Sequence, residues 1–266
     1  SGEANPFDSE RREREAFDAW LSGWTGVHSA MTDVLQELLN EERGSSRISF
    51  SQYRNELFEI ISYLIKHPNP LPADEELKTA VMTTTSPGEK EQIVSDPYSI
   101  AINTVRGRAF QAFALFVYQD GKKFPKDEKI KIASDVKGLY GAALKDEKTR
   151  ALMFIFGHYL PSFYFRDKEW IRGLLPQIFP ADEEKKRLYT AAWEGYVSAN
   201  LYEEIFFDPD IQKLYERGLT LTDADFPKQK HFKDPDEGIA VHLALAFMHF
   251  SKFGFDHELF KKFWGT

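Results

Sequence analysis

The sequence predicts an all-α protein, in which antiparallel helix pairs stack as an irregular α-solenoid of the HEAT or TPR type, or pack as a multi-helix bundle. Three observations predict this fold class. Apolar residues recur at helical spacing along most of the chain, Asp-Pro pairs precede several of these stretches, and no segment has the composition of a convincing strand. The periodic stretches amount to about ten to twelve helices, most of them joined by short links.

The clearest helix start in the chain is Asp96-Pro97, where the aspartate can cap and the proline fits the first helical position. A helix is expected over residues 96–118. Its apolar positions are Ile102, Val105, Ala109, Phe113 and Phe116, and a second, small or polar stripe is formed by Asn103, Gly107, Gln111 and Ala114. We expect this helix to be central, covered by others on most sides, and approached closely by a neighbouring helix at Gly107.

The part of the chain before this helix divides into a helical unit, residues 1–72, and a mobile loop or linker, residues 73–95. Residues 8–43 are expected to form two helices, interrupted near Gly23 and Gly26. A further helix begins at Ser49 or Ser51 and runs to Lys66, because three prolines between residues 67 and 72 end it. The inward positions expected for this helix are Phe50, Tyr53, Leu57, Ile60, Ile61 and Leu64.

Residues 96–266 are expected to form a helical-repeat domain, which either stands apart from residues 1–72 or continues them as one domain. Helix starts are predicted at Pro125 or Asp127, and then at Asp146, Asp167, Asp182, Asp208, Asp234 and Asp256. The corresponding ends are Lys145, a break or kink at Pro161, then Pro176 or Pro180, Asn200, Gly218, Gly254 and Trp264. Two similar stretches, residues 71–76 and 179–184, hint at a repeat, although both have the composition of a helix start.

Composition excludes several classes of function. The net charge of −8 argues against a module that binds duplex nucleic acid, and the absence of cysteine excludes thiolate nucleophiles and cysteine-based zinc sites. The sequence contains no run of about 18 apolar residues, which a transmembrane helix would need. We therefore expect a cytoplasmic protein without a membrane partner. Aromatic residues make up 15% of the chain, which favours ring packing between helices, with some rings serving as recognition anchors.

No pattern for catalysis, a cofactor or a metal ion stands out, and we predict none of them for this chain. Phosphate-binding loops, zinc-protease helices, nucleophile elbows and calcium loops are missing from the sequence. His242 and His249 share a helix face, but their spacing is too long for two ligands of one ion. The carboxylates of Glu183-Glu184 and Glu203-Glu204 diverge on a helix and do not suggest acid–base chemistry.

Two stretches carry candidate binding residues. Arg106 and Arg108 are two positions apart, so they point to roughly opposite sides of their helix, and at most one of them can line a given groove. We expect one of the pair to tie down a neighbouring carboxylate or helix C-terminus. Residues 159–170 hold five aromatic side chains and Arg166 at a helix break, which predicts either a hydrophobic corner around Pro161 or the wall of an adhesive groove.

Three stretches together resemble a known family: residues 102–109 (Ile-Asn-Thr-Val-Arg-Gly-Arg-Ala), residues 156–161 (Phe-Gly-His-Tyr-Leu-Pro) with Asp167 and Trp170, and residues 192–196 (Ala-Trp-Glu-Gly-Tyr). Their order is similar to that in the C-terminal helical-repeat region of large bacterial and archaeal STAND-type NTPases of the antiviral, Avs-like group. The resemblance covers approximately residues 96–265.

In that family the C-terminal repeats act as a sensor that binds a phage protein, such as the terminase large subunit or the portal. Binding drives oligomerisation of a separate NTPase core and switches on an effector. The present sequence has no phosphate-binding loop, so the resemblance implies a non-catalytic sensor region of a longer protein. For such a region, we predict partner contacts at Arg108, Tyr164, Arg166 and Trp170.

Two alternatives stay open. A helical enzyme acting on sugars or lipids would need a deep, aromatic-lined cleft with convergent polar groups of shifted pKa. A structural adaptor that stacks within a larger protein would show a broad apolar patch at one end of the helical stack.

Overall fold

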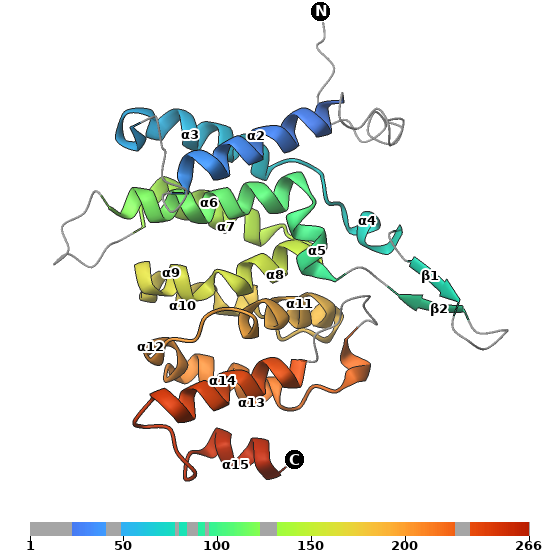
Figure 1. The fold of residues 1–266 in the computed structure, drawn as a ribbon, viewed down its shortest axis with the longest axis vertical. Helices are drawn as coiled ribbons and strands as arrows, with labels where there is room; N and C mark the ends of the chain where they lie inside the picture. The colour runs from blue at the N-terminus through green and yellow to red at the C-terminus, as the bar shows by residue number, and fades with distance from the viewer. Residues whose placement is uncertain are drawn as a thin grey trace, which may run out of the picture.

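A computed structural model of the protein describes residues 23–40, 49–77, 80–83, 90–93, 96–122, 132–226 and 235–265. Within these residues the chain forms layers of helices that follow one another from the N-terminal to the C-terminal end (Figure 1). The prediction of an all-α protein is confirmed.

The first layer of the stack consists of α2 (Trp24–Leu39) and α3 (Phe50–Ile65), and both helices pack on α6 (Val105–Gly121). Further along the chain, α8 (Arg150–His158) packs on α11 (Lys186–Val197), and α14 (Pro235–His249) lies against α11. The remaining helices are α4 (Pro72–Leu77), α5 (Pro97–Ile102), α7 (Ser134–Lys145), α9 (Leu160–Arg166), α10 (Lys168–Ile178), α12 (Glu203–Phe206), α13 (Pro209–Gly218) and α15 (Glu258–Gly265), with short 3-10 turns η3 (Glu183–Lys185) and η4 (Asp223–Asp225).

A small hairpin corrects the expectation that residues 73–95 form a loop without regular structure. Strand β1 (Ala80–Thr83) pairs antiparallel with β2 (Lys90–Ile93), so that Ala80 faces Ile93 and Thr83 faces Lys90. Residues 72–77 form α4. Val81, Thr83 and Ile93 are β-branched, which favours extended backbone over helix. A loop was expected at residues 83–88, and all of these residues except Thr83 lie outside the described part of the chain.

The central stretch is two helices rather than the single helix predicted over residues 96–118. Asp96 caps α5 as expected, accepting the Ser99 N–H at 2.7 Å, but the chain becomes extended at Thr104 and starts again as α6. Asn69, far away in sequence, makes this restart favourable. Its side-chain oxygen accepts the Val105 N–H at 3.1 Å and its carbonyl oxygen accepts the Arg106 N–H at 2.9 Å, which satisfies two donors that a helix start leaves free.

A close approach occurs at Gly107 as predicted, but the neighbour is α5, which the prediction had placed in the same helix as Gly107. A Cβ atom added at Gly107 would overlap the carbonyl oxygen of Ala101. The same relationship joins α8 and α11, where a Cβ at Gly157 or at Gly195 would meet the backbone of the opposite helix. Each of the three stretches that resemble the STAND family contains one of these glycines, so in this chain the three glycines serve helix packing.

Several predicted helix boundaries are correct because the signal is local. Asp167 caps α10 by accepting the Trp170 N–H at 3.2 Å, and Asp208 caps α13 by accepting the Asp210 N–H at 3.0 Å. Pro161 marks a break as expected, because α8 ends at His158 and α9 begins at Leu160.

Other boundaries differ from the prediction. The helix expected from residue 125 or 127 begins at Ser134; residues 132–133 are not helical, and residues 123–131 lie outside the described part. Asp146 ends α7, and Thr149 caps α8 in its place. Tyr53 and Ile60 on α3 are exposed rather than inward. Pro176 lies within α10, and α14 ends at His249 instead of Gly254. Residues 1–22, 41–48 and Asp234 lie outside the described part.

The two stretches that hinted at a repeat have different roles. Glu75, in the first, is 2% exposed, and its carboxylate accepts the Arg150 and Ala151 N–H groups at 2.9 and 2.8 Å, at the start of α8. Burial raises the pKa of Glu75. Glu183, its counterpart, is exposed in η3. The resemblance between the two stretches therefore reflects helix-start composition.

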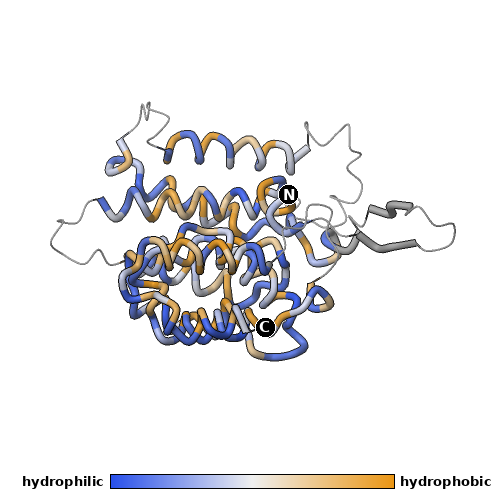
Figure 2. Tube along the Cα trace, turned by 60° about the horizontal axis from the view of Figure 1, so that its bottom comes forward, coloured by the Kyte–Doolittle hydropathy of each residue, from blue (hydrophilic) through white to orange (hydrophobic). Residues whose placement is uncertain are grey.

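Aromatic rings fill the spaces between layers, as the composition indicated. One cluster joins α6 to α7, α8 and α9, and a second joins α11 to α12 and α13; they are centred on Phe110, Tyr140, Phe156 and Phe163, and on Trp193, Tyr196, Phe206 and Tyr215. Hydrophobic and hydrophilic segments alternate along the helices, as expected for amphipathic helices packed in layers (Figure 2). One cluster of buried residues extends from Leu35 on α2 to Leu259 on α15.

Candidate protein-recognition surface

Arg108 is tied to the first layer of the stack. Its guanidinium donates to the Ser29 hydroxyl oxygen at 2.6 Å and forms an ion pair with Asp33, both on α2. Arg106 turns to another side of α6 and donates to the Glu147 carboxylate at 3.2 Å. The predicted divergence of the two arginines is confirmed. Because Asp33 neutralises its charge, Arg108 holds helices together and offers a partner little.

Tyr164 points into the protein rather than outward. It is 4% exposed, and its hydroxyl donates to the Asp208 carboxylate at 2.7 Å. Burial, and then the hydrogen bond to Asp208, raise the pKa of the phenol. A partner cannot reach this ring without unfolding the corner around it, so we remove Tyr164 from the candidate contacts.

Trp170 lies at the edge of the same corner and is half-buried. Its ring packs edge-on against Tyr140, with ring centroids 5.1 Å apart, and the Lys137 ammonium lies 5.5 Å from its ring centroid. Lys137 also pairs with Asp167 at 2.6 Å. Of the two readings of residues 159–170, the hydrophobic corner describes Tyr164 and Trp170 well.

Arg166 is the predicted contact that the structure leaves available. Its guanidinium carbon lies 5.2 Å from the ring centroid of Tyr118, and one terminal nitrogen donates to the Tyr118 carbonyl oxygen at 3.4 Å. Its Nε is buried without a hydrogen-bond partner, and burial lowers the pKa of the group. Within the described part of the chain, no carboxylate pairs with Arg166.

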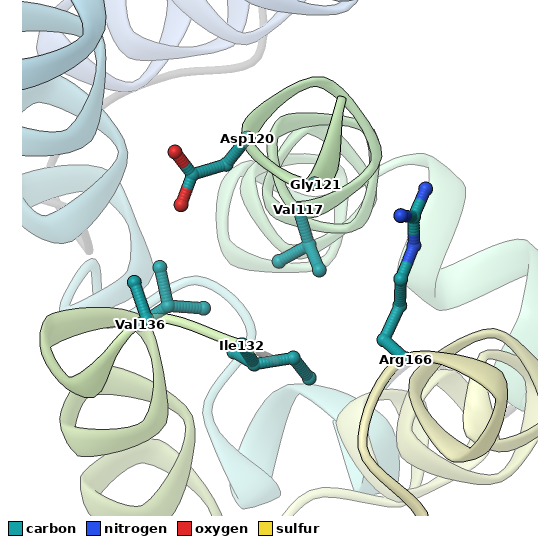
Figure 3. Close-up of a pocket in the computed structure, with 7 residues that line it drawn as sticks. Val117, Asp120, Gly121, Ile132, Val136 and Arg166 are labelled. Carbon is teal, nitrogen blue, oxygen red and sulfur yellow. The ribbon is translucent and has the colours of Figure 1, made fainter. Parts of the chain in front are cut away.

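Two small hollows flank Arg166. The first is lined by Val117, Asp120, Gly121, Ile132, Ala133, Val136 and Arg166, and Figure 3 shows Asp120 and Arg166 on opposite sides of it. Asp120 does not neutralise Arg166, because it receives two hydrogen bonds from Arg54, at 2.9 and 3.0 Å. The second hollow lies between Tyr118, Ser162 and Phe163. Neither has room for more than about one water molecule, so neither can hold a sugar or a lipid.

Exposed aromatic rings stand beside this arginine. Phe165 is 76% exposed, and Tyr118 is 39% exposed with its hydroxyl donating to Ser162 at 2.6 Å. Ser162, Phe165 and Arg166 share one side of α9, because they are spaced by three and four residues. We call Tyr118, Phe165 and Arg166 the α6–α9 edge.

Sequence reasoning did not single out Tyr118 or Phe165. The apolar stripe of the central helix includes Val105, Ala109 and Phe116, and Tyr118 does not belong to it. Its position outside the stripe is the signal that could have marked Tyr118 as exposed. Phe165 was one of five aromatic residues in its stretch, and the sequence offers no sign of which rings are covered.

A second exposed apolar surface lies at the C-terminal end of the stack. It consists of Val241, Ala244, Leu245, Phe247 and Met248 on α14, with Phe255 and Trp264 from the following turn and α15. We call these seven residues the end face. Met248, Phe255 and Trp264 are 72%, 70% and 71% exposed.

The histidines considered as metal ligands are placed apart. His242 is buried; its Nδ1 accepts from the Tyr215 hydroxyl at 2.6 Å and its Nε2 donates to the Ala199 carbonyl oxygen at 3.0 Å, which holds the ring neutral. His249 is exposed. Among the described residues, no cluster of three or more His, Asp or Glu side chains could hold a metal ion. No described helix is long and apolar enough to span a bilayer.

No protein-family model, curated protein or solved structure matches this chain. The resemblance to STAND NTPases therefore stays a prediction, and the candidate surfaces are argued from the contacts and exposure of their own residues.

Proposed function

We propose that this chain is a protein-recognition module that binds its partner through the α6–α9 edge. The observation that supports this is Arg166, a cation stacked on Tyr118 beside the exposed ring of Phe165, with no carboxylate partner in the described residues. Arginine and large aromatic residues dominate the binding energy of protein interfaces, because they combine area with directed polar contacts.

The arrangement of Arg166 favours a particular kind of partner. Stacking on Tyr118 holds the guanidinium in place before binding, so less side-chain entropy is lost on association. A partner carboxylate over this group would accept a hydrogen bond from Nη1, the terminal nitrogen that makes none within the described residues, whereas Nε is buried. The partner segment therefore presents an Asp or Glu close to an apolar side chain that covers Phe165.

The resemblance of the sequence supplies a class of partner. We propose that the module is the sensor region of a STAND-type NTPase in cytoplasmic antiphage defence, and that the phage terminase large subunit or portal is its target. In this role the chain performs no chemistry itself, and oligomerisation of the parent NTPase follows target binding.

Co-purification with a panel of phage terminase and portal proteins tests the proposal. We expect one of them to form a stable complex, and Phe165→Ala or Arg166→Ala to weaken it by at least about tenfold. Tyr202→Ala is the matched control, because Tyr202 is 55% exposed but lies on another part of the stack, before α12. A complex whose affinity is unchanged by both edge variants would refute binding through this edge.

A second role, that of a structural adaptor, is favoured by the end face. A broad apolar surface at one end of a helical stack is what an adaptor needs to continue against another protein surface. The two roles use residues on different helices. Measuring partner binding by variants of the α6–α9 edge and by variants of the end face therefore distinguishes the recognition role from the adaptor role.

A further inference from the structure

Helix α14 is apolar on two opposite sides, but only one side is covered. Its buried stripe is formed by Ile239, His242, Leu243 and Ala246, each at most 3% exposed. The opposite stripe, Val241, Ala244, Leu245 and Met248, faces solvent at the same helical spacing. A helix that is hydrophobic all round is normally covered on both sides, and the last layer of a stable solenoid carries a polar outer surface. On α14, the exposed residues between Glu237 and His249 are all apolar.

The exposed stripe continues into α15 through a row of aromatic rings. The ring of Phe247 packs against Phe255 at a centroid distance of 4.9 Å, Phe255 against Phe260 at 5.1 Å, and Phe260 against Trp264 at 5.9 Å. The end face is therefore one continuous surface rather than scattered apolar residues.

The area of this surface fits a dimer interface. With usual areas for side chains of this size, the exposed parts of the end face amount to roughly 700 Å². The largest apolar patch on a typical monomer is about 300–600 Å², and a stable interface buries about 800 Å² on each partner. The end face is thus larger than a monomer usually exposes and close to what one half of a dimer buries.

The charges at the two ends of the stripe are arranged for self-association. Glu237 lies on α14 four residues before Val241, and Lys252 lies four residues after Met248, in the turn that follows the end of α14 at His249, so opposite charges lie beyond the two ends of the stripe. Both side chains are exposed, and neither forms an ion pair within the described residues. If a second α14 lay antiparallel across the first, each Glu237 would lie at the same end of the interface as the Lys252 of the other copy.

We propose that the end face is a homodimer interface, in which a second copy of this chain packs its α14 antiparallel on the first about a two-fold axis. Such an interface is self-complementary: Val241 of one copy contacts Met248 of the other, and the reverse contact repeats it. The antiparallel pair also places the positive and negative ends of the two helix dipoles side by side. This interface is independent of binding at the α6–α9 edge.

Sedimentation equilibrium of the full chain over a wide concentration range tests this inference. We expect the mass of a dimer at high concentration, and Met248→Glu to raise the dissociation constant at least about hundredfold, because it buries one charge at each end of the apolar stripe. Phe165→Ala, on the α6–α9 edge, is expected to leave the dimer intact. A chain that stays monomeric at every concentration, or a dimer unaffected by Met248→Glu, overturns the proposal.

A charge exchange tests the antiparallel arrangement itself. Glu237→Lys and Lys252→Glu, each alone, place like charges together at both ends of the interface and are expected to weaken the dimer by about tenfold. The double variant restores opposite charges and is expected to recover the original dissociation constant. Since both positions are exposed, circular dichroism should show an unchanged helical fold. If the double variant is no tighter than the single ones, the antiparallel two-fold interface is wrong.

Discussion

Gly195 on α11 lies against the carbonyl oxygen of Phe154 on α8, so closely that a methyl group at Gly195 would overlap it. Gly157 on α8 stands in the same relation to Ala192 on α11. The two helices therefore touch backbone to backbone at two points. This contact, in the middle of the stack, fixes how the N-terminal layers sit on the C-terminal ones.

We predict that Gly195→Ala or Gly157→Ala lowers the free energy of unfolding by about 3 kcal/mol, because the helices must separate to admit the methyl group. Gly173→Ala is the control. Gly173 lies exposed within α10 with open space around it, so alanine there should stabilise the protein by about 0.5–1 kcal/mol through helix propensity. Urea denaturation followed by circular dichroism gives both values, and an unchanged midpoint for Gly195→Ala would contradict the close contact.

Tyr164→Phe removes the hydroxyl that donates to Asp208 while keeping the buried ring. We expect a loss of about 1.5 kcal/mol in the free energy of unfolding, since a buried carboxylate loses one of its hydrogen bonds. Target binding should be unchanged, because Tyr164 does not reach the surface. Tyr202→Phe, at an exposed ring, is the matched control and should leave stability unaltered. Thermal unfolding measures the first effect, and a stable Tyr164→Phe protein with weakened binding would contradict both statements.

Arg54 joins α3 to α6 and α7 by contacting Asp120 and Asp135 together. It donates to Asp120 at 2.9 and 3.0 Å and to Asp135 at 2.7 and 3.1 Å. Arg54→Gln removes the arginine's charge and hydrogen bonds from the Asp120 carboxylate, which is 5% exposed, and should cost about 3 kcal/mol at neutral pH. Lys261→Gln, which breaks an exposed pair with Glu258, should have no measurable effect.

The same contact predicts acid sensitivity. The hydrogen bond from Arg54 lowers the pKa of Asp135 below its usual 3.8. A carboxyl whose pKa is depressed by folding contributes its stability fully above 3.8 and loses it as the pH falls towards the folded-state pKa. The wild-type protein should therefore lose stability below about pH 4. Arg54→Gln should show a shallower loss over the same range, measured as unfolding midpoints against pH, and an equal slope would count against the pairing.

His242 predicts a second pH effect, at milder acidity. Burial lowers its pKa below 6.5, so the unfolded chain binds a proton more readily than the folded one. Stability is therefore complete above pH 6.5 and falls as the pH drops below it, by at most about 1.4 kcal/mol per pH unit for each such histidine. His28 and His158 contribute in the same direction. His242→Gln should reduce this slope between pH 6.5 and 5, measured as unfolding midpoints against pH, and an unchanged slope would contradict this role of His242.

The sequence is informative where the determining contact is local. Asp167 and Asp208 cap the helices that follow them, and Pro161 breaks its helix, because each acts on neighbouring backbone groups. The break before α6 was missed because its partner, Asn69, lies 36 residues away from Val105. Periodicity likewise shows that α14 has apolar residues on several sides, but only the packed structure shows which side is covered.

The candidate contacts illustrate the same limit. Arg166 and Tyr164 belong to one aromatic stretch, and the sequence marks both equally as candidate contacts. Tyr164 points inward, where Asp208, 44 residues further along the chain, accepts a hydrogen bond from its hydroxyl. Arg166 stays available because Asp120, across the hollow from it, is already paired with Arg54. The local sequence pattern predicts neither the burial of Tyr164 nor the availability of Arg166. Both depend on which helices the stack brings together.

Asp208 is held from three directions: by the Tyr164 hydroxyl on α9, by Arg172 on α10 at 3.4 Å, and by the Asp210 N–H at the start of α13. Because one carboxylate links three segments, a change in the length of chain between α10 and α13 would be expected to release at least one of them. Related sequences that keep this arrangement should tolerate substitution in that connection but not insertion or deletion. The constancy of this spacing would offer a way to recognise distant relatives whose residues have otherwise diverged.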